Sequence, residues 1–325
     1  MLRYRTLRDP FKGVLAAGLG LLMAGCFSDP DLNTGLTPEG APRVLAMMAW
    51  DTATRSERAA FCRYEGGVLD PKAPSLVQGS IKCPDKESDF VAAQLEPLSW
   101  NVRAVFDELL NGDKVEKLTY NEATDIYTGH IDETLPFDIS CGGMTIGYDG
   151  YYYPNGNKES NPVGPALVAQ PADLAPTDSD CQVTIKPSVV VDKQGEPVPS
   201  GTNENVFTIH VKQLDVVETD PVDADAVADR AELDPDGAVA FLFNSLVDDT
   251  SIAASEIEIR NLDTNAVVPS DFAVGDNELD IFGVASLPPG NYAASIKATA
   301  SIADIVGGTR TFADDVTVRF VVPMP

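Results

Sequence analysis

The chain has 325 residues, a formal net charge of −27 and 44% hydrophobic residues. This length is enough for about two domains of ordinary size, and the 24 prolines and 25 glycines favour many turns over long helices. So acidic a surface repels phosphate backbones and therefore argues against a nucleic-acid partner.

The first 25 residues are typical of an export signal. Basic side chains precede the apolar run GVLAAGLGLLM at 13–23, which is too short to span a bilayer. The run ends in LLMAGC and resembles a bacterial lipobox, although Met23 stands where that family usually has leucine. The resemblance implies cleavage before Cys26, a lipid such as palmitate on that cysteine, and a membrane anchor. Because Phe27 rather than aspartate follows, it also implies the outer membrane. Ordinary secretion with cleavage nearby is the alternative.

The cysteine count agrees with export. Setting Cys26 aside as the lipidated residue leaves Cys62, Cys83, Cys141 and Cys181, and four cysteines allow three disulfide connectivities. We favour Cys62–Cys83, which closes a local loop, and Cys141–Cys181, which ties strands of one sandwich; an oxidising compartment permits both. A zinc site is disfavoured, because there is no C-x-x-C pair and neither histidine is near these cysteines in sequence.

Regular patterning begins after a polar stretch. Residues 26–41 are rich in Pro, Gly and Asp and indicate a tether, and a first strand is predicted at 43–50. Residues 51–99 show no sustained period. We predict that they form an insertion held by the first disulfide rather than by a core of its own, and that 87–95 can form a short helix.

The segment VRAVFDELL at 102–110 fits two patterns. Its apolar residues fit one face of a helix, which would present Asp107 and Glu108 as a catalytic carboxylate pair, but they also fit a strand at Val102–Phe106 followed by a turn. The segment VAFLFNSLV at 239–247 aligns with it, keeps the apolar positions and lacks both acids. We therefore predict a strand and a turn, with no catalytic role for the acids.

A second matched block follows in the same order. VTIKPSVVVDKQG at 183–195 resembles ASIKATASIADIVG at 294–307, with one residue inserted. Two ordered blocks indicate an internal repeat. We predict two homologous domains at 42–212 and 230–325, separated by an acidic linker at 213–229.

The second domain shows the pattern of an antiparallel β-sandwich. Short alternating segments separated by polar turns predict six or seven strands in about a hundred residues. LPPGNY at 287–292 further predicts a tyrosine corner, in which the hydroxyl of Tyr292 caps backbone groups at the edge of the sandwich. The predicted strands are 238–243, 256–260, 266–270, 278–282, 292–298 and 316–322.

On these motifs the second domain resembles bacterial Ig-like domains of the SbsA type: a turn, a strand ending in Phe243, LPPGNY, and a late D…G before the last strand. The first domain resembles a decorated copy through VRAVFDELL, GYDGYYYPNGN and VVVDKQGEPVP, as in Ig-like repeats of Gram-negative envelope lipoproteins. The resemblance implies an all-β chain of two tandem Ig-like sandwiches with a structural or adhesive role and no catalytic residues. Cys181 aligns with Tyr292, so a disulfide is expected to replace the corner tyrosine's hydrogen bond there.

The aromatic cluster YDGYYYPNGN at 148–157 is the one candidate binding rim. Tyr151 and Tyr153 share a face of a strand, and together with Tyr148 they could contact a protein or a glycan. The alternative is that these tyrosines pack the edge of the sandwich.

Residues suited to catalysis are scarce. The only histidines are His130, expected in a loop, and His210, expected on a strand, and no G-x-S-x-G surrounds a serine. ELDPDG at 232–237 begins like a calcium loop but has Phe243 where the bidentate acid belongs. No metal or cofactor is expected.

We predict a non-enzymatic envelope lipoprotein for adhesion, scaffolding or recognition of an unidentified protein or glycan. The alternative is a glycan- or calcium-linked binding module of a surface enzyme complex, with the linker aspartates as loose calcium ligands.

Overall fold

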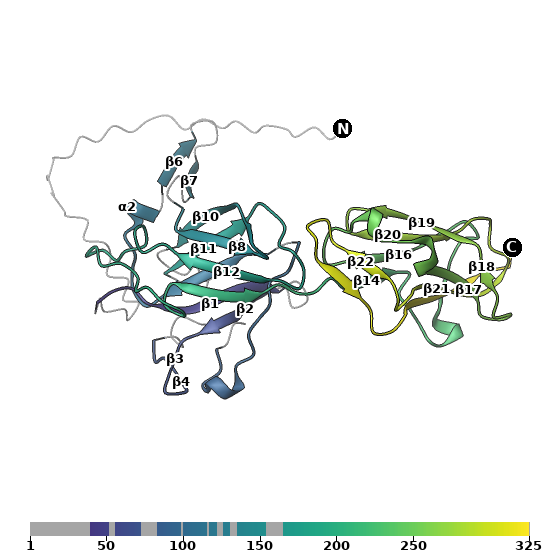
Figure 1. Ribbon diagram of the computed structural model, residues 1–325, viewed down its shortest axis with the longest axis horizontal. Helices are drawn as coiled ribbons and strands as arrows, with labels where there is room; N and C mark the ends of the chain where they lie inside the picture. The colour runs from purple at the N-terminus through teal and green to yellow at the C-terminus, as the bar shows by residue number, and fades with distance from the viewer. Residues whose placement is uncertain are drawn as a thin grey trace, which may run out of the picture. The chain divides into compact units, whose positions relative to one another are not determined.

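The computed structural model describes residues 40–324 apart from 52–55, 73–82, 99, 116, 122–125, 131–134 and 154–164. The predicted signal peptide, Cys26 and nearly all of the predicted tether lie outside these residues. Strands make up almost all of the regular structure, in mostly antiparallel sheets, so the all-β class is confirmed (Figure 1). In the part of the chain that the structure describes, no helix has the length and apolar character needed to cross a bilayer.

The first half of the described chain forms a sandwich of two sheets, with strand orders β10-β11-β5-β1-β2 and β13-β12-β8-β9. Its strands are β1 (Val44–Asp51), β2 (Ser56–Cys62), β5 (Val102–Phe106), β8 (Phe137–Cys141), β9 (Met144–Thr145), β10 (Tyr148–Tyr153), β11 (Ala166–Pro171), β12 (Asp180–Ile185) and β13 (Val206–His210).

The second half forms a sandwich with strand orders β14-β16-β20-β19 and β15-β24-β21-β17-β18. Its strands are β14 (Val216–Asp220), β15 (Ala231–Glu232), β16 (Ala238–Phe243), β17 (Ile257–Asn261), β18 (Val267–Val268), β19 (Ser270–Gly275), β20 (Glu278–Gly283), β21 (Gly290–Ile296) and β24 (Val316–Val322).

The two sandwiches have the same strand order. One sheet reads β10-β11-β5-β1 in the first sandwich and β19-β20-β16-β14 in the second, and the facing sheet reads β9-β8-β12-β13 and β18-β17-β21-β24. The strands also follow one another along the chain in the same sequence, with β2 and β15 as additions. The blocks aligned in the sequence fall on matching strands, β5 with β16 and β12 with β21.

Each sandwich buries its own core between its two sheets. In the second, Val239, Phe241 and Phe243 of β16 face inward, as the alternation predicts, and Val102, Ala104 and Phe106 of β5 do so in the first. Strand β5 ends at Phe106, and turn residues follow it. The strand interpretation of VRAVFDELL is therefore confirmed, and the helical one is wrong.

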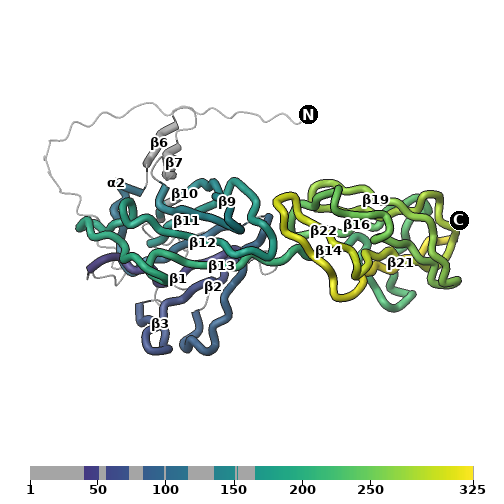
Figure 2. The backbone as a smooth tube through the Cα atoms, viewed as in Figure 1, coloured from purple at the N-terminus to yellow at the C-terminus, as the bar shows by residue number. Residues whose placement is uncertain are grey.

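The first sandwich differs in that its β1–β5 sheet is also covered on its outer face. Every residue of β5 is buried, and Val105 packs with Met48, Leu69 and the Cys62–Cys83 pair in a separate small core. Tyr64 of β3 (Tyr64–Glu65) and Leu69 of β4 (Val68–Leu69) also pack in this core. In the view of Figure 2, β3 lies below β1 and β2. The insertion is therefore held by the disulfide, as predicted, and also by apolar packing against the outer face of this sheet, which its lack of periodicity does not predict.

The prediction of a linker at 213–229 is also wrong, because part of this segment is a strand of the second sandwich. Its residues 216–220 form β14, which pairs with β16 at the edge of the second sandwich. An edge strand has one neighbour, and β14 is also bulged between Val216 and Glu218, so its side chains are largely exposed and do not alternate. The composition of a solvated edge strand therefore resembles that of a linker.

The remaining elements are short. Residues 87–95 hold one turn of 3₁₀ helix and otherwise run extended, because their backbone bonds go to neighbouring strands: Ala93 N donates to Ala59 O and Leu95 N donates to His210 O. The other short elements are α2 (Gly112–Val115), β6 (Lys117–Asn121), β7 (Ile126–His130), β22 (Ser301–Ala303), β23 (Thr309–Thr311), and the 3₁₀ turns η1 (Glu87–Asp89), η2 (Val227–Asp229), η3 (Asp249–Ser251) and η4 (Ala254–Glu256).

Candidate functional site

The proposed tyrosine rim lies on β10, and at least part of it is buried. The hydroxyl of Tyr148 accepts from Phe137 N at 2.7 Å and donates to Phe137 O at 2.9 Å, and the side chain is 8% exposed. Burial raises the pKa of Tyr148 well above its ordinary value. Tyr148 is thus wrong as a rim residue, and the edge-packing alternative is correct for it.

Tyr152 is buried in the same way. Its hydroxyl accepts from Leu110 N at 2.8 Å and donates to Leu110 O, so it fixes the turn that follows β5. The side chains of Tyr151 and Tyr153 are outside the described residues, and these two positions stay a prediction.

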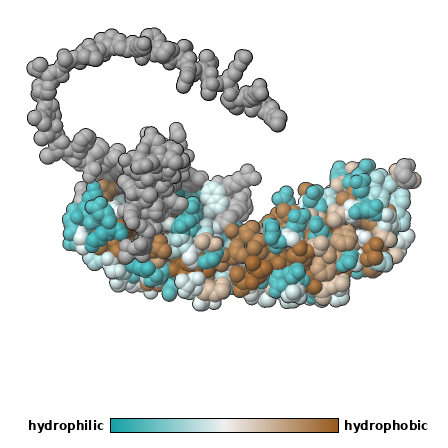
Figure 3. All heavy atoms as spheres, turned by 90° about the horizontal axis from the view of Figure 1, so that it is seen from above, coloured by the Kyte–Doolittle hydropathy of each residue, from teal (hydrophilic) through white to brown (hydrophobic). Residues whose placement is uncertain are grey.

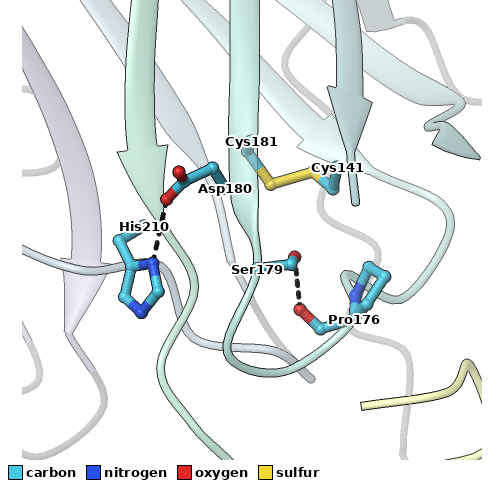
Figure 4. Close-up of a disulfide and its surroundings, with 6 residues drawn as sticks. All are labelled: Cys141, Pro176, Ser179, Asp180, Cys181 and His210. Carbon is cyan, nitrogen blue, oxygen red and sulfur yellow. Dashed lines mark hydrogen bonds and ion pairs between the residues drawn. A yellow bond between two sulfur atoms is a disulfide. The ribbon is translucent and has the colours of Figure 1, made fainter. Parts of the chain in front are cut away.

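Both disulfides pair as predicted: Cys62 with Cys83 and Cys141 with Cys181. Cys141 and Cys181 are direct cross-strand neighbours on β8 and β12 (Figure 4). Direct neighbours in the matching strands of the second sandwich are Asn261 and Tyr292. The predicted equivalence of Cys181 and Tyr292 is therefore supported by the strand register.

Tyr292 makes the predicted corner. Its side chain is 1% exposed, its ring stacks on Phe320 with centroids 5.6 Å apart, and its hydroxyl donates to Pro288 O at 2.8 Å. At the two equivalent positions, the first sandwich has a covalent bond and the second has a hydrogen bond.

His210 lies at the end of β13, where the sequence predicts a strand residue. Its Nδ1 is 2.9 Å from Asp180 Oδ1 and its Nε2 is 3.3 Å from Asp178 Oδ1, and the side chain is 41% exposed. Figure 4 shows Ser179 directed at Pro176, to whose carbonyl it donates at 2.7 Å, rather than at the imidazole. Both ring nitrogens and the adjacent hydroxyl are thus engaged in other contacts. His130 ends β7 rather than lying in a loop.

The two acids that follow β5 belong to a corner of the first sandwich. Asp107 Oδ1 accepts from Arg43 N at 2.8 Å, and Asp107 N donates to Arg43 O at 3.1 Å. In the second sandwich, Asn244 makes the same two bonds with Asp215, at 2.9 and 3.1 Å. Because a neutral amide does this work equally well, the charge of Asp107 is not required for it.

A second set of bonds completes each corner. Asn111 N donates to Val191 O and Asp248 N donates to Ala303 O, both at 2.9 Å, and Leu110 and Val247 form bridges to Asp192 and Asp304, respectively. We call residues 107–111 with 190–196 the first corner, and 244–248 with 303–308 the second corner. The aspartates of both corners stand in the repeated D…G blocks, which could have identified them from the sequence.

Charge distinguishes the two corners. Glu108 of the first corner is 4% exposed and lies near Asp107 and Asp192, which are also buried. Burial, reinforced by Asp107 and Asp192, raises the pKa of Glu108 to about 7, although Lys72 acts in the opposite direction. In the second corner, Ser245 takes the place of Glu108. A carboxyl with this pKa can exchange a proton near neutral pH, and its neighbours Asp107 and Asp192 belong to the corner itself.

Two aspartates of the predicted linker, Asp223 and Asp225, contact an arginine side chain. Arg319 Nη1 lies 2.7 Å from Asp223 Oδ2 and 3.0 Å from Asp225 Oδ1, and Asp223 Oδ1 also accepts from Arg319 N. Over the described ranges, no group of three or more His, Cys, Asp or Glu side chains is arranged to hold a metal ion. These two linker acids are thus paired with a cation of the chain itself.

A polar cavity is lined by Glu96, Lys212, Asp215, Glu218, Asn244 and their neighbours. Lys212 Nζ contacts the Glu96 carboxylate, and the Asn244 amide donates to Gln213 O at 2.9 Å. The side chains of Glu96, Lys212 and Asn244 are therefore already used within the chain.

The exposed surface mixes apolar and polar residues. Figure 3 shows separate hydrophobic areas among hydrophilic ones, and Val217, Val222 and Val284 are each more than half exposed. Single exposed valines of this kind are ordinary on a soluble surface.

No protein-family model matches the chain, and no curated protein is similar enough in sequence to match it.

Proposed function

We propose that this protein is a lipid-anchored component of the bacterial cell envelope. Two tandem Ig-like sandwiches would act there in adhesion, scaffolding or partner recognition, without catalysis. The observation that carries the proposal is the repetition of one strand order and one hydrogen-bonded corner in both sandwiches. It supports the Ig-like interpretation and gives Asp107, the first acid of the conspicuous pair, a structural role.

The cysteines support export to the cell envelope. Four of the five cysteines are consumed in two disulfides, which form and persist in oxidising compartments. The fifth, Cys26, ends the lipobox-like LLMAGC. A single cysteine left over at this position is what an exported lipoprotein needs for its anchor.

The surface supports recognition of a protein or glycan rather than of nucleic acid. The net charge of −27 disfavours contact with phosphate backbones. Sandwiches present loops and edge strands to partners, and here Asp107 and His210 already make contacts within the fold.

The anchor is tested by feeding cells a clickable palmitate analogue and probing the full chain. We expect labelling of the wild type and loss of labelling in Cys26→Ala, with Ser28→Ala labelled normally as the matched control. Labelling that persists in Cys26→Ala would refute the anchor.

Recognition is tested by proximity labelling from the anchored protein in intact cells. We expect one set of envelope proteins or glycans that is lost when Cys26→Ala releases the chain. An unchanged set after release would show that anchoring does not determine the partners.

A further inference from the structure

The carboxylate of Asp304, in the second corner, accepts hydrogen bonds from both sandwiches. Its Oδ1 accepts from Val306 N at 3.0 Å and Gly308 N at 2.8 Å within its own turn. Its Oδ2 accepts from Thr177 N at 2.8 Å, and Thr177 lies in the loop 172–179 between β11 and β12 of the first sandwich. Asp304 is 1% exposed and Thr177 is 3% exposed, so solvent does not weaken this bond.

Gly308 makes room for this approach. A Cβ on Gly308 would lie 2.1 Å from Thr177 Oγ1, 2.6 Å from Asp304 Oδ2 and 2.8 Å from Thr177 O. The last of these atoms is backbone, which cannot rotate away as the end of a flexible side chain can. Only glycine fits between the turn and the loop.

The first corner shows that the fold itself does not need this glycine. Asp192 makes the same turn as Asp304: its N donates to Glu196 O at 2.9 Å, and its Oδ1 accepts from Glu196 N at 2.6 Å. Glu196, at the position of Gly308, carries a full side chain. The small residue in the second corner therefore serves the contact with loop 172–179 and not the turn.

Other contacts surround this one. Arg310, two residues beyond Gly308, contacts the side chain of Gln213, and Gln213 O accepts from Asn244 of the second corner. Residues Leu36–Pro325 form one compact unit that includes both sandwiches. Buried hydrogen bonds to a carboxylate are stronger than those between neutral groups.

We propose that loop 172–179 is a strap that couples the folding of the two sandwiches through Thr177, Asp304 and Gly308. The two sandwiches then unfold as one cooperative unit rather than as independent domains. This goes beyond the proposed function and does not depend on it, because the coupling needs neither the lipid nor a partner.

Two spectroscopic signals distinguish the unfolding of the first sandwich from that of the whole chain. Both tryptophans, Trp50 and Trp100, lie in the first sandwich, so their fluorescence reports that sandwich, whereas far-UV circular dichroism reports both. In urea, the two signals of the full wild-type chain should give the same midpoint, as a cooperative transition requires.

Gly308→Ala places a wedge on the second sandwich only. We expect the tryptophan midpoint of the first sandwich to fall nonetheless, with the unfolding constant raised about tenfold or more, as for a lost charged hydrogen bond. Gly275→Ala is the matched control, because a Cβ there meets nothing within 4 Å, and it should leave the coupling intact.

Thr177→Pro tests the strap from the other side by removing the N–H donor. Far-UV dichroism should then show the second sandwich unfolding separately and at a lower urea concentration. The substitution itself lies outside the second sandwich. The proposal is overturned if Gly308→Ala moves only the dichroism signal. If Gly308→Ala fails to fold, an unmoved second sandwich in Thr177→Pro overturns it equally.

Discussion

The two corners use one backbone arrangement with different side chains. Asp107 and Glu108 stand in the first where Asn244 and Ser245 stand in the second, and the backbone bonds around them match. The comparison shows that the acid pair is a variation on a structural turn. It also shows what the acids add, because only the first corner buries a carboxyl whose pKa is raised to about 7.

The outer faces of the equivalent sheets differ as well. Arg103 on β5 corresponds to Ala240 on β16. The insertion covers the outer face of β5, so Arg103 is 5% exposed and its Nε donates to both oxygens of Glu57, at 2.9 and 2.8 Å. A covered sheet can hold a charge only if the charge is paired.

Arg103→Ala, which gives the first sandwich the residue of the second, should have the largest effect. Glu57 would stay buried without its partner, which should lower the unfolding free energy by about 3–5 kcal/mol. Urea unfolding followed by tryptophan fluorescence measures the loss. The double variant Glu57→Leu/Arg103→Leu should recover most of it, and equal loss in both variants would contradict a role for the charge.

Cys141→Ser/Cys181→Ser removes the covalent bond that the second sandwich replaces with the Tyr292 corner. Opening this loop, with its sequence separation of 40, should lower the unfolding free energy by about 3–4 kcal/mol through the entropy of the unfolded chain. Urea unfolding of the oxidised double variant and the wild type measures it. A reductant should destabilise the wild type and leave a variant lacking all four disulfide cysteines unchanged.

Tyr148→Phe and Tyr292→Phe compare hydroxyls between the two sandwiches. Loss of the Tyr148 hydroxyl leaves the buried Phe137 N and Phe137 O without this hydrogen-bond partner. This should lower the unfolding free energy by about 1–3 kcal/mol. Tyr292→Phe removes one bond and should cost about 1 kcal/mol. Thermal unfolding of the two variants ranks them, and a larger loss for Tyr292→Phe would contradict this assignment.

A further expected effect depends on pH. Because the pKa of Glu108 is raised from 4.5 to about 7 on folding, the folded chain binds one more proton than the unfolded chain between these values. The contribution of Glu108 is fully present below about pH 4.5 and is lost as the pH rises through 7.

Glu108→Ser, which copies Ser245, should remove this dependence and make the variant the more stable chain at pH 8. Urea midpoints at pH 5 and pH 8 measure it. Parallel pH profiles for the variant and the wild type would contradict the assignment, and Glu278→Ser, on the exposed side of β20, is the control.

Much of this architecture is visible in the sequence because it is local or repeated. The alternation of Val239, Phe241 and Phe243 indicates a strand with one inward face, and the matching VRAVFDELL removes the helical interpretation of the first copy. Four cysteines after Cys26 limit the pairings to three, and LPPGNY places Tyr292 at a corner. These signals depend on spacing along the chain.

Other features depend on which strands become neighbours, and spacing does not contain that information. The alternation on β10 does not say which face is inward, and the sheet turns Tyr148 toward Phe137. β14 reads as a linker because an edge strand keeps most of its side chains in water. Burial of the outer face of β5 follows from an insertion that has no period of its own.

An all-β, repeated and disulfide-bonded chain can be predicted from residue order, because period, repetition and cysteine count are properties of the chain. Three other findings come from the fold: Asp107 and Asn244 make equivalent bonds, Glu108 is buried among carboxylates, and Thr177 donates to Asp304. Those facts arise from contacts between residues up to 127 positions apart, and packing alone brings such residues together.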